Sequence, residues 1–420
     1  MVYIKKVIEI GSGENSTYTE DVFGISGEFD IDNLCGTLSF NLPYWLSMPD
    51  STVQQGVISD AGVNTNALKK FDSANLYFAE FDTDPGDVTQ VDTGEYQAGG
   101  ITLTKIFEGF IDTIKLSKSK SNINYELGCL GSMGISNYRN LTYQHTEGVA
   151  SELIPTLLQI SGLQQGQFNV YPVDRDLIPA NKIRFIDVDS QNRILITDGG
   201  TSLKEVIDKL REKYALIFHQ SGDGYFNIMT PFSLVQPQNN STLSVFAWNF
   251  DINLGNLYEI DNGDLTMDYN AIVVLGAPPI YGIAVDVIAV QNNGGQVNYL
   301  IHENRDLQSD EDCQKVARDK LFDLNKNYII TLKTKFDPNF MVGQPVTIND
   351  NDRFNGTQVF TLKKYSFSIS KDDVSCSVQV FNNSSNFIPP TLANDPSGVY
   401  DVDILNIRDK ELDSNQWGKL

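Results

Sequence analysis

The chain has 420 residues, of which 41% are hydrophobic and 20% are charged, and its 54 acidic and 31 basic side chains give a formal net charge of −23. This composition is typical of a globular protein large enough for about two to four domains, and it excludes wholesale disorder. Because basic side chains supply the affinity of a protein for a phosphate backbone, the charge also excludes sequence-specific binding of nucleic acid. An acidic surface past which nucleic acid slides is compatible with it.

The N-terminal segment is predicted to be a strand and not a leader. Lys5 and Lys6 lie inside an apolar alternation, and the segment lacks both the apolar run and the small-residue cleavage site of a signal peptide. The chain has no stretch of about 18 apolar residues, so no membrane-spanning helix is predicted.

Four cysteines lie far apart in the sequence, each within a segment that reads as a buried strand or helix: Cys35, Cys129, Cys313 and Cys376. So few and so scattered, they predict buried thiols in a reducing compartment and not a disulfide framework.

Most of the chain alternates between apolar and polar residues. The clearest runs are residues 29–40, 361–369 and 375–381, and glycine, asparagine and aspartate separate such runs along the chain. The pattern predicts antiparallel strands with one buried and one solvent-facing side. Two tight hairpins are also predicted: Gly222-Asp223-Gly224 joining strands 214–219 and 225–229, and Asn293-Gly294 joining strands 285–290 and 297–301.

Three segments have the helical period of 3.6 residues: 150–160, 203–214 and 310–324. Ser202 and Glu205 have the spacing of a capping box at the start of the second segment. Ser309 is the expected N-cap of the third, whose predicted inward-facing side chains are Cys313, Val316, Ala317, Leu321 and Leu324.

These elements divide the chain into blocks. Residues 1–135 are nearly all strand with a loop-rich insertion at 46–100, residues 136–245 hold two of the helices, and residues 246–388 form a second strand-rich block with one helix. The tail 389–420 is polar and is expected to become ordered only against another surface. The sequence thus predicts a mainly β, multidomain protein in which two strand-rich units flank a small α+β segment.

Catalytic and cofactor-binding residues are not predicted. The three histidines, His145, His219 and His302, are far apart in sequence, and neither a dinucleotide-binding glycine turn nor a phosphate-binding Gly-Lys-Ser/Thr motif occurs. For His219, which ends an apolar strand, a structural role is favoured over a ligand role.

The best metal-like pattern places Asp187, Asp189 and Asp198 at positions one, three and twelve of a calcium-loop spacing. Asn192 stands at position six, where the calcium loop needs glycine, and the first two aspartates also fit a plain alternating strand. The strand interpretation is favoured, so no metal is predicted. Carboxylates in the loop 82–92 are likewise interpreted as a solvated turn.

Four segments have a further pattern when they are taken in order. A strand at 106–114 with its partner at 123–131 is followed by a helix that ends at Ser161-Gly162-Leu163. A helix, strand, Asp-Gly, strand unit then covers 201–228, and a helix that leads into strands covers 310–367.

In order and spacing, these segments resemble the central baseplate hub proteins of long-tailed bacteriophages and of contractile injection systems. The similarity spans about residues 100–385. One departure is Gln344, which follows Gly343 where the family usually has aspartate.

The resemblance implies two tail-tube-like antiparallel β-barrels flanking the middle domain, in a homotrimer that adapts the sixfold tail tube to the threefold spike and surrounds the DNA exit path. It implies a non-enzymatic virion protein of the tail baseplate, made in the host cytoplasm, with the tube protein, the spike and the tape-measure protein as partners and without a cofactor. The tail 391–420 is then a candidate docking strap with Trp417 as its anchor. The excess negative charge would repel DNA if it lined the channel.

Two other functions stay open from the sequence. One is the ring protein that joins tube to baseplate, which needs one barrel and not two. The other is a carbohydrate-binding or receptor-binding β-protein, with possible glycan hydrolysis by carboxylates of the 82–92 loop.

Overall fold

The computed structural model describes much of both strand-rich blocks and short parts of the segment between them. The described residues are 2–11, 17–43, 68–92, 94–118, 123–138, 168–170, 202–205, 207–208, 217–224, 226–229, 248–251, 256–262, 269–286, 290, 295–305, 307–325, 329–343, 345–350, 356–371 and 373–382. The helix predicted at 150–160 lies outside them.

The first block contributes seven strands to one long sheet: β1 (Tyr3–Ile10), β2 (Thr17–Thr19), β3 (Phe23–Asp30), β4 (Thr37–Pro43), β5 (Ser73–Phe81), β9 (Thr104–Lys118) and β10 (Ile123–Gly131). A short 3-10 helix, η4 (Ser132–Asn137), follows β10. Burial alternates along β4: Leu38, Phe40 and Leu42 are buried, whereas Thr37 and Ser39 are exposed. The predicted two-residue period therefore sorts apolar side chains to one face.

The second block contributes six strands to the same sheet: β14 (Trp248–Asp251), β15 (Leu257–Asn262), β19 (Ile329–Thr334), β20 (Pro345–Asp350), β21 (Gly356–Ile369) and β22 (Val374–Asn382). The order is β15-β19-β22-β21-β3-β4-β10-β9-β5-β1-β2, with β20 paired to β21 and β14 paired to β20. All neighbours along this path are antiparallel, whereas β14 and β20 are parallel.

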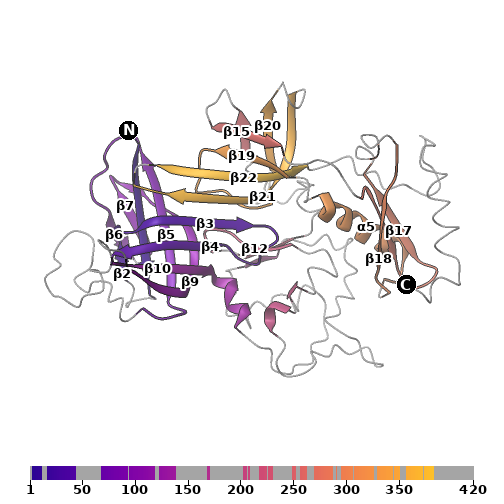
Figure 1. Cartoon of the computed structure of the whole chain (residues 1–420), viewed down its shortest axis with the longest axis horizontal. Coiled ribbons are helices and arrows are strands. Elements are labelled where there is room, and N and C mark those ends of the chain that lie inside the picture. Colours follow the sequence, from indigo (N-terminus) through magenta and orange to yellow (C-terminus); the bar gives the residue numbers. More distant parts are fainter. Residues whose placement is uncertain are drawn as a thin grey trace.

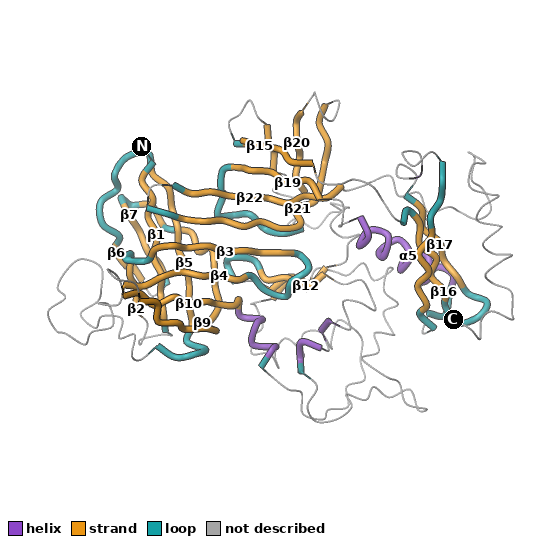
Figure 2. Tube along the Cα trace, viewed as in Figure 1, coloured by secondary structure: helices purple, strands orange, loops and turns teal. Residues whose placement is uncertain are grey.

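Strand β21 joins the two blocks by pairing with β3, in register from Lys364 opposite Asp30 to Ile369 opposite Ile25. Both blocks also share one hydrophobic core. Within it Phe29 stacks on Tyr365 at 4.9 Å between ring centroids. The long sheet is therefore a single structure built from the two ends of the described chain, as Figures 1 and 2 show.

A second aromatic group spans the blocks away from the β3–β21 ladder. The Phe336 ring follows β19 and lies 5.4 Å from the ring of Phe78 in β5 and 4.9 Å from that of Phe367 in β21. Lys335 beside it forms an ion pair with Glu80 of β5 at 3.2 Å. Strands far apart in the sheet order therefore meet across the core.

A separate α/β unit lies within residues 246–388. It contains β16 (Ala271–Leu275), β17 (Tyr281–Val285) and β18 (Tyr299–Glu303), in the order β17-β16-β18, together with α5 (Asp310–Asn325). Figure 1 shows this unit at the opposite end of the molecule from β1 and β5. The structure thus separates the helix of this block from the strands of the long sheet.

Helix α5 confirms the prediction for 310–324. The amide of Asp312 donates to the Ser309 hydroxyl at 3.1 Å, which is the predicted N-cap. Four of the five predicted inward-facing side chains are buried and Leu324 is partly buried, all in one cluster with strands β16 and β17. The Gln314 side-chain oxygen accepts a hydrogen bond from the Ile283 amide at 3.0 Å, which fixes the helix along β17.

The hairpin predicted between strands 285–290 and 297–301 is wrong in its pairing, and its turn residues Asn293 and Gly294 lie outside the described residues. Strands β17 and β18 do not pair with each other, because both pair with β16, β17 antiparallel and β18 parallel. Every side chain of β16 is buried. An all-apolar strand needs both of its faces covered, and α5 covers one face of β16 while Val290 packs on the other. Local turn chemistry could not reveal this central place.

The hairpin predicted around Gly222-Asp223-Gly224 is confirmed. Strands β12 (Ile217–Gln220) and β13 (Phe226–Met229) are antiparallel, and β11 (Phe168–Val170) adds to β13 in parallel. The capping box is present as well: the Glu205 amide donates to the Ser202 hydroxyl at 3.2 Å, and the Ser202 amide donates to the Glu205 carboxylate at 3.3 Å.

The segment predicted as a loop-rich insertion at 46–100 contains β5 of the long sheet. After β5, a small sheet is formed by β6 (Thr89–Asp92), β7 (Glu95–Ala98) and β8 (Ile101–Thr102). Tyr96 of β7 is buried against Val7 and Tyr77 of the long sheet. The described residues are thus mainly β, in several sheets of largely antiparallel strands, as predicted. Among the helices described, none is long and apolar enough to span a membrane.

We expect Phe367→Ala to lower the free energy of unfolding by about 3–5 kcal/mol, because the ring fills the core at the join between blocks. Denaturant titration would measure this loss, and hydrogen exchange should accelerate in both β3 and β21. Phe23→Ala is the control, since Phe23 is 39% exposed on β3. Faster exchange in β21 and β22 alone would contradict a shared core.

Candidate functional site

Four residues were named from the sequence as weak metal candidates or as a docking anchor: Asp187, Asp189, Asp198 and Trp417. All four lie outside the described residues, so their roles stay predictions. Within the described residues, no group of three or more histidine, cysteine, aspartate or glutamate side chains could hold a metal ion. His219 in β12 and His302 in β18 belong to different sheets.

The four cysteines are free thiols; Cys129, Cys313 and Cys376 are buried as predicted, whereas Cys35 is partly exposed. Burial raises the pKa of Cys35 to about 11 and that of Cys313 and Cys376 to about 12. The pKa of Cys129 is raised even further, again by burial. Because the thiolate is the nucleophile, these thiols are inert near neutral pH.

The most distinctive surface of the described chain is the solvent-facing side of the long sheet. Strands β22, β21, β3, β4, β10 and β9 place a row of small polar residues in register across this side. Backbone pairing aligns them in the order Ser375, Ser368, Ser26, Ser39, Gly128 and Thr113. The hydroxyl oxygens of Ser26 and Ser39 are 2.7 Å apart and share a hydrogen bond. We call this the hydroxyl row.

A second row runs beside it, with Ser377, Ser366, Glu28 and Thr37 aligned on β22, β21, β3 and β4. Together the rows line a shallow groove of about 670 Å³ that crosses the join between the blocks. Small polar residues lie here because side chains alternate between the two faces of a strand. The intervening residues, such as Phe367 and Leu38, are buried in the core.

Charged side chains in the groove are neutralised by neighbours. Glu28 pairs with Lys364 at 2.9 Å, and Lys333 pairs with Glu259 of the adjacent strand. Asp112 accepts hydrogen bonds from Tyr138 and pairs with Lys70 at 3.0 Å, and the Tyr138 hydrogen bond is the main cause of its lowered pKa.

The groove offers many hydroxyl groups but no activated nucleophile. Its lining residues include no histidine, and its two cysteines, Cys129 and Cys376, have raised pKa values. A serine hydroxyl needs an adjacent base before it attacks a substrate. Such a surface can hydrogen-bond to water or to a hydrated polymer, and its one lysine, Lys333, is paired with Glu259 and gives little affinity for a polyanion.

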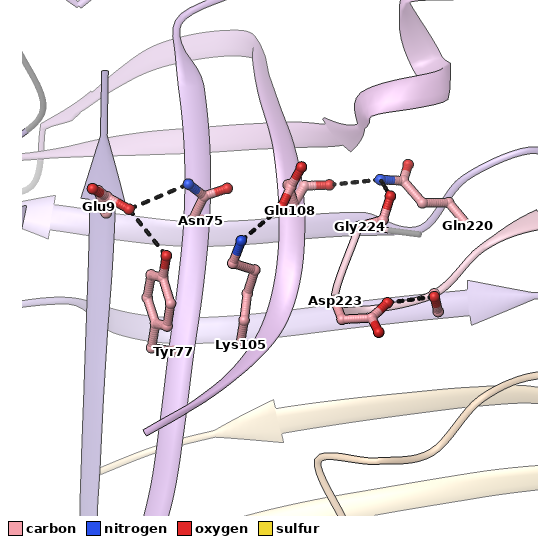
Figure 3. Close-up of polar contacts among 9 residues, drawn as sticks. Glu9, Asn75, Tyr77, Lys105, Glu108, Gln220, Asp223 and Gly224 are labelled. Carbon is pink, nitrogen blue, oxygen red and sulfur yellow. Dashed lines mark hydrogen bonds and ion pairs between the residues drawn. The ribbon is translucent and has the colours of Figure 1, made fainter. Parts of the chain in front are cut away.

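The β12–β13 hairpin docks on β9 at a junction that is drawn in Figure 3. Gln220 is 2% exposed. Its side-chain nitrogen donates to the carbonyl oxygens of Glu108 at 3.2 Å and Gly224 at 3.3 Å. Its side-chain oxygen accepts from the Met133 amide at 3.3 Å. One side chain thus ties the hairpin to β9 and η4.

Glycines allow this close approach. A Cβ on Gly222 would lie 2.5 Å from the carbonyl oxygen of Ile106, and one on Gly131 would lie 2.4 Å from the Gln220 side-chain oxygen. Gly224 has φ of +94°, and the Glu108 carboxylate occupies the position that its Cβ would take. The hairpin therefore docks on the first block through backbone and cannot tolerate larger side chains there.

A polar cluster continues along β9, β5 and β1 (Figure 3). Lys105 pairs with Glu108 at 2.7 Å. Tyr77 donates to the buried Glu9 carboxylate at 3.1 Å, and Asn75 donates to the same oxygen at 3.3 Å. Burial is the main cause of the raised pKa of Tyr77, followed by the Glu9 charge. The contacts of Glu9 join β1 to β5, whereas the Lys105–Glu108 pair lies within β9.

Sequence reasoning identified solvent-facing alternation on 361–369 and 375–381 but missed the groove. The signal was present as serine at alternate positions in both runs. What the sequence could not show is that β3 and β4, far away in the chain, align their own serines with these.

No protein-family model matches this sequence, and neither does any curated protein. The fold does match solved structures. The 43 kDa tail protein of prophage MuSo2 from Shewanella oneidensis is similar with a TM-score of 0.57 and 10% identity, over 90% of this chain and 98% of that one.

Two further structures are similar. A tail protein from Neisseria meningitidis MC58 has a TM-score of 0.55 and 12% identity, over 90% of this chain and 97% of that one. A chain of the Francisella PdpA-VgrG complex has a TM-score of 0.50 and 8% identity, over 94% of this chain and 60% of that one. The chain therefore has the fold of phage tail proteins along nearly its whole length.

We expect Gln220→Leu to lower the free energy of unfolding by about 1–3 kcal/mol, because it removes the buried hydrogen bonds to the Met133 amide and the Glu108 carbonyl. Hydrogen exchange at the Met133 amide should accelerate more than in the rest of η4. Gln90→Leu on the exposed face of β6 is the control. Unchanged exchange at Met133 would show that the hairpin is held in another way.

We expect the Cys376 thiol of the folded protein to react with a thiol reagent at pH 8 at least about 100-fold more slowly than that of the unfolded chain. A pKa raised from about 8.5 to about 12 leaves only a trace of thiolate at this pH. Mass spectrometry of labelled peptides, with and without denaturant, would measure both rates. Equal rates would contradict the burial of this residue.

Proposed function

We propose that the chain is a structural virion protein: the trimeric baseplate hub at the tip of a phage tail. The observation that carries the proposal is the fold, which matches two tail proteins over 90% of this chain and nearly all of theirs. In this proposal the protein is not an enzyme, and it adapts a sixfold tail tube to a threefold spike.

The two strand-rich blocks support this adaptor role. We propose that residues 1–135 and 246–388 each provide one tube-like barrel unit around the middle domain 136–245, so that three chains present six units. The β3–β21 ladder would then join the two units of each chain as one rigid body, since it carries six residue pairs and a shared core.

The hydroxyl-lined groove suits a surface that DNA passes without binding. Its hydroxyl groups keep it hydrated, and its one lysine, Lys333, is paired with Glu259, so the groove offers little positive charge to a passing phosphate backbone. We propose this face as a border of the DNA exit path. Under this proposal the non-adhesive property comes from neutral side chains, and the net charge of −23 is not needed for it.

The other functions considered from the sequence gain less support. A carbohydrate site usually exposes aromatic rings, but the only aromatic residue lining the groove is Phe367, which is buried. The ring protein needs one barrel, whereas the long sheet takes strands from both blocks. The tube protein, spike and tape-measure protein remain the proposed partners, and the tail 391–420 with Trp417 remains the proposed docking strap.

We expect the purified chain to have three times the mass of one chain in light scattering or native mass spectrometry. Single-particle images should show threefold symmetry around a central opening. A monomer at all concentrations, or a ring of six chains, would contradict the hub proposal. Images would also show whether the face with Ser26 and Ser39 borders the opening.

A further inference from the structure

The two strand-rich blocks repeat one arrangement of strands. Four strands of the first block lie in the order β3-β4-β10-β9, and four strands of the second lie in the order β15-β19-β22-β21. Ranked along the chain within each block, both orders read first, second, fourth, third. The third strand of each block is the longest and also pairs at its start with one more strand, β9 with β5 and β21 with β20. The long sheet therefore contains an internal structural repeat.

A bulge fixes which residues of the two long strands correspond. Asp112 of β9 and Lys363 of β21 are each skipped in the pairing with the next strand of their block, β10 and β22. Counted from the bulge, residues 113–118 of β9 correspond to residues 364–369 of β21. Residues 364–369 pair along their other edge with β3, the first strand of the other four. Among the strands that the structure describes, residues 113–118 pair with β10 and have no partner along their other edge.

The side chains along this edge of β9 are apolar and exposed where their counterparts are buried. Tyr365 and Phe367 are each 3% exposed at the junction with β3. Their counterparts Ile114 and Leu116 are 37% and 57% exposed. Apolar side chains along an unpaired strand edge favour the addition of another strand. The edge of β9 therefore lacks the neighbour that the edge of β21 has.

The backbone of β9 has hydrogen-bonding groups that point to the same edge. The Gly131 amide donates to the Gly36 carbonyl at 2.9 Å, at the end of the ladder between β10 and β4. Because antiparallel strands bond through alternate residues, the odd-numbered residues of β10 bond to β4 and the even-numbered residues bond to β9. Lys115 lies opposite an even-numbered residue of β10. The amides of Ile114 and Leu116 therefore point away from β10 and toward the free edge.

The second block offers the kind of strand that this edge lacks. The strand β15 holds in its block the place that β3 holds in the first, and it is the end strand of the order among the described strands. In Figure 1 the β15 and β9 labels lie on opposite sides of β3 and β21, in agreement with that order. Each chain thus carries both halves of a second junction of the β3–β21 kind, one on each side of the first.

We propose that residues 113–118 of β9 pair with β15 of a second copy of this chain, so that the β3–β21 junction is repeated between chains. This inference rests on the proposed trimer and assigns the contact that would build it. The added strand would cover Ile114 and Leu116 as β3 covers Tyr365 and Phe367. A contact between two different surfaces of identical chains is head-to-tail, and such contacts close into a ring when the rotation allows.

The repeat also predicts the register of this contact. Ser368 of β21 lies opposite Ser26 of β3. Ser117 corresponds to Ser368, because each is the fifth residue after the bulge of its strand. Asp261 of β15 corresponds to Ser26, because each begins a row of aligned residues that ends directly after the bulge. The rows are Ser26, Ser39, Gly128 and Thr113 in the first block and Asp261, Thr331, Gln379 and Lys364 in the second. Ser117 of one chain should therefore lie opposite Asp261 of the other.

A disulfide between chains tests this register. The Ile31 amide donates to the Lys363 carbonyl at 2.9 Å, so odd-numbered residues of β3 bond to β21 and even-numbered residues do not. Ser117 and Asp261 would form a pair of the second kind, with Cα atoms about 4.5 Å apart, which suits a disulfide. A chain with both Ser117→Cys and Asp261→Cys should give covalent dimers and trimers on mild oxidation. Non-reducing electrophoresis would measure them, and a thiol should reverse them.

Each single cysteine variant should remain uncross-linked in the same gel, because the contact joins two different edges. Ser117→Cys with Asp373→Cys is the matched control, since Asp373 is also an exposed aspartate but lies in the turn between β21 and β22. This pair should cross-link no faster than wild-type chains, whose four cysteines set the background.

Leu116→Pro tests the pairing without a cross-link. Proline removes the amide that points to the free edge and places its ring there, while the bonds from β9 to β10 remain. The dissociation constant of the oligomer should rise by at least about 100-fold in light scattering over a dilution series. Val91→Pro is the matched control, since Val91 is also 57% exposed but lies on β6. Both variants should keep the unfolding midpoint of the wild type measured in the monomeric range, and the cross-link decides if Leu116→Pro does not.

The outcomes separate this inference from the proposed function. A trimeric wild type whose double cysteine variant cross-links no faster than the control would overturn the pairing and leave the hub proposal standing. A folded Leu116→Pro variant that stays trimeric would do the same. Cross-linking through Ser117→Cys alone would show that two β9 edges meet, which a head-to-tail contact excludes. A wild type that is monomeric at all concentrations would overturn both proposals.

Discussion

The pairing of β3 with β21 is the constraint on which the rest of the described structure depends. It joins the N-terminal block to the C-terminal block through a ladder from Ile25 and Ile369 to Asp30 and Lys364. Closing so long a loop is entropically unfavourable, and the shared core must offset that cost. The stacked rings of Phe29 and Tyr365 lie at this join, and the apolar surface that they bury helps to offset the entropic cost.

The same ladder creates the groove. Because side chains alternate between the two faces of a strand, placing Phe367 and Ile369 in the core forces Ser366 and Ser368 to the solvent side. Pairing then aligns them with Glu28 and Ser26 on a strand from the other block. The hydroxyl-lined surface thus results directly from the core pattern of strands that come from distant parts of the chain. One side of the sheet forms the core, and the other forms the groove of the proposed hub.

The structure also distinguishes satisfied polar groups from incomplete apolar ones. Gln220 and Glu9 are buried, and their side chains find hydrogen-bond partners within the chain. Leu116 on β9 and Val91 on β6 have no such internal complement, and both are more than half exposed.

The sequence by itself determined the elements whose signals are local. The helix at 310–324 with Ser309 as its cap, the turn at Gly222-Asp223-Gly224 and the capping box of Ser202 and Glu205 depend on nearby side chains, and the structure confirms each of them. The sequence also determined which face of each long strand is buried, because that follows from a two-residue period. Only the tertiary structure decided which strands are neighbours. It placed β16 between β17 and β18, against the turn signal at Asn293-Gly294, and it set β3 beside β21 to assemble the groove. Strand order depends on burying apolar faces against distant segments, and that free energy is not encoded in any single stretch of sequence.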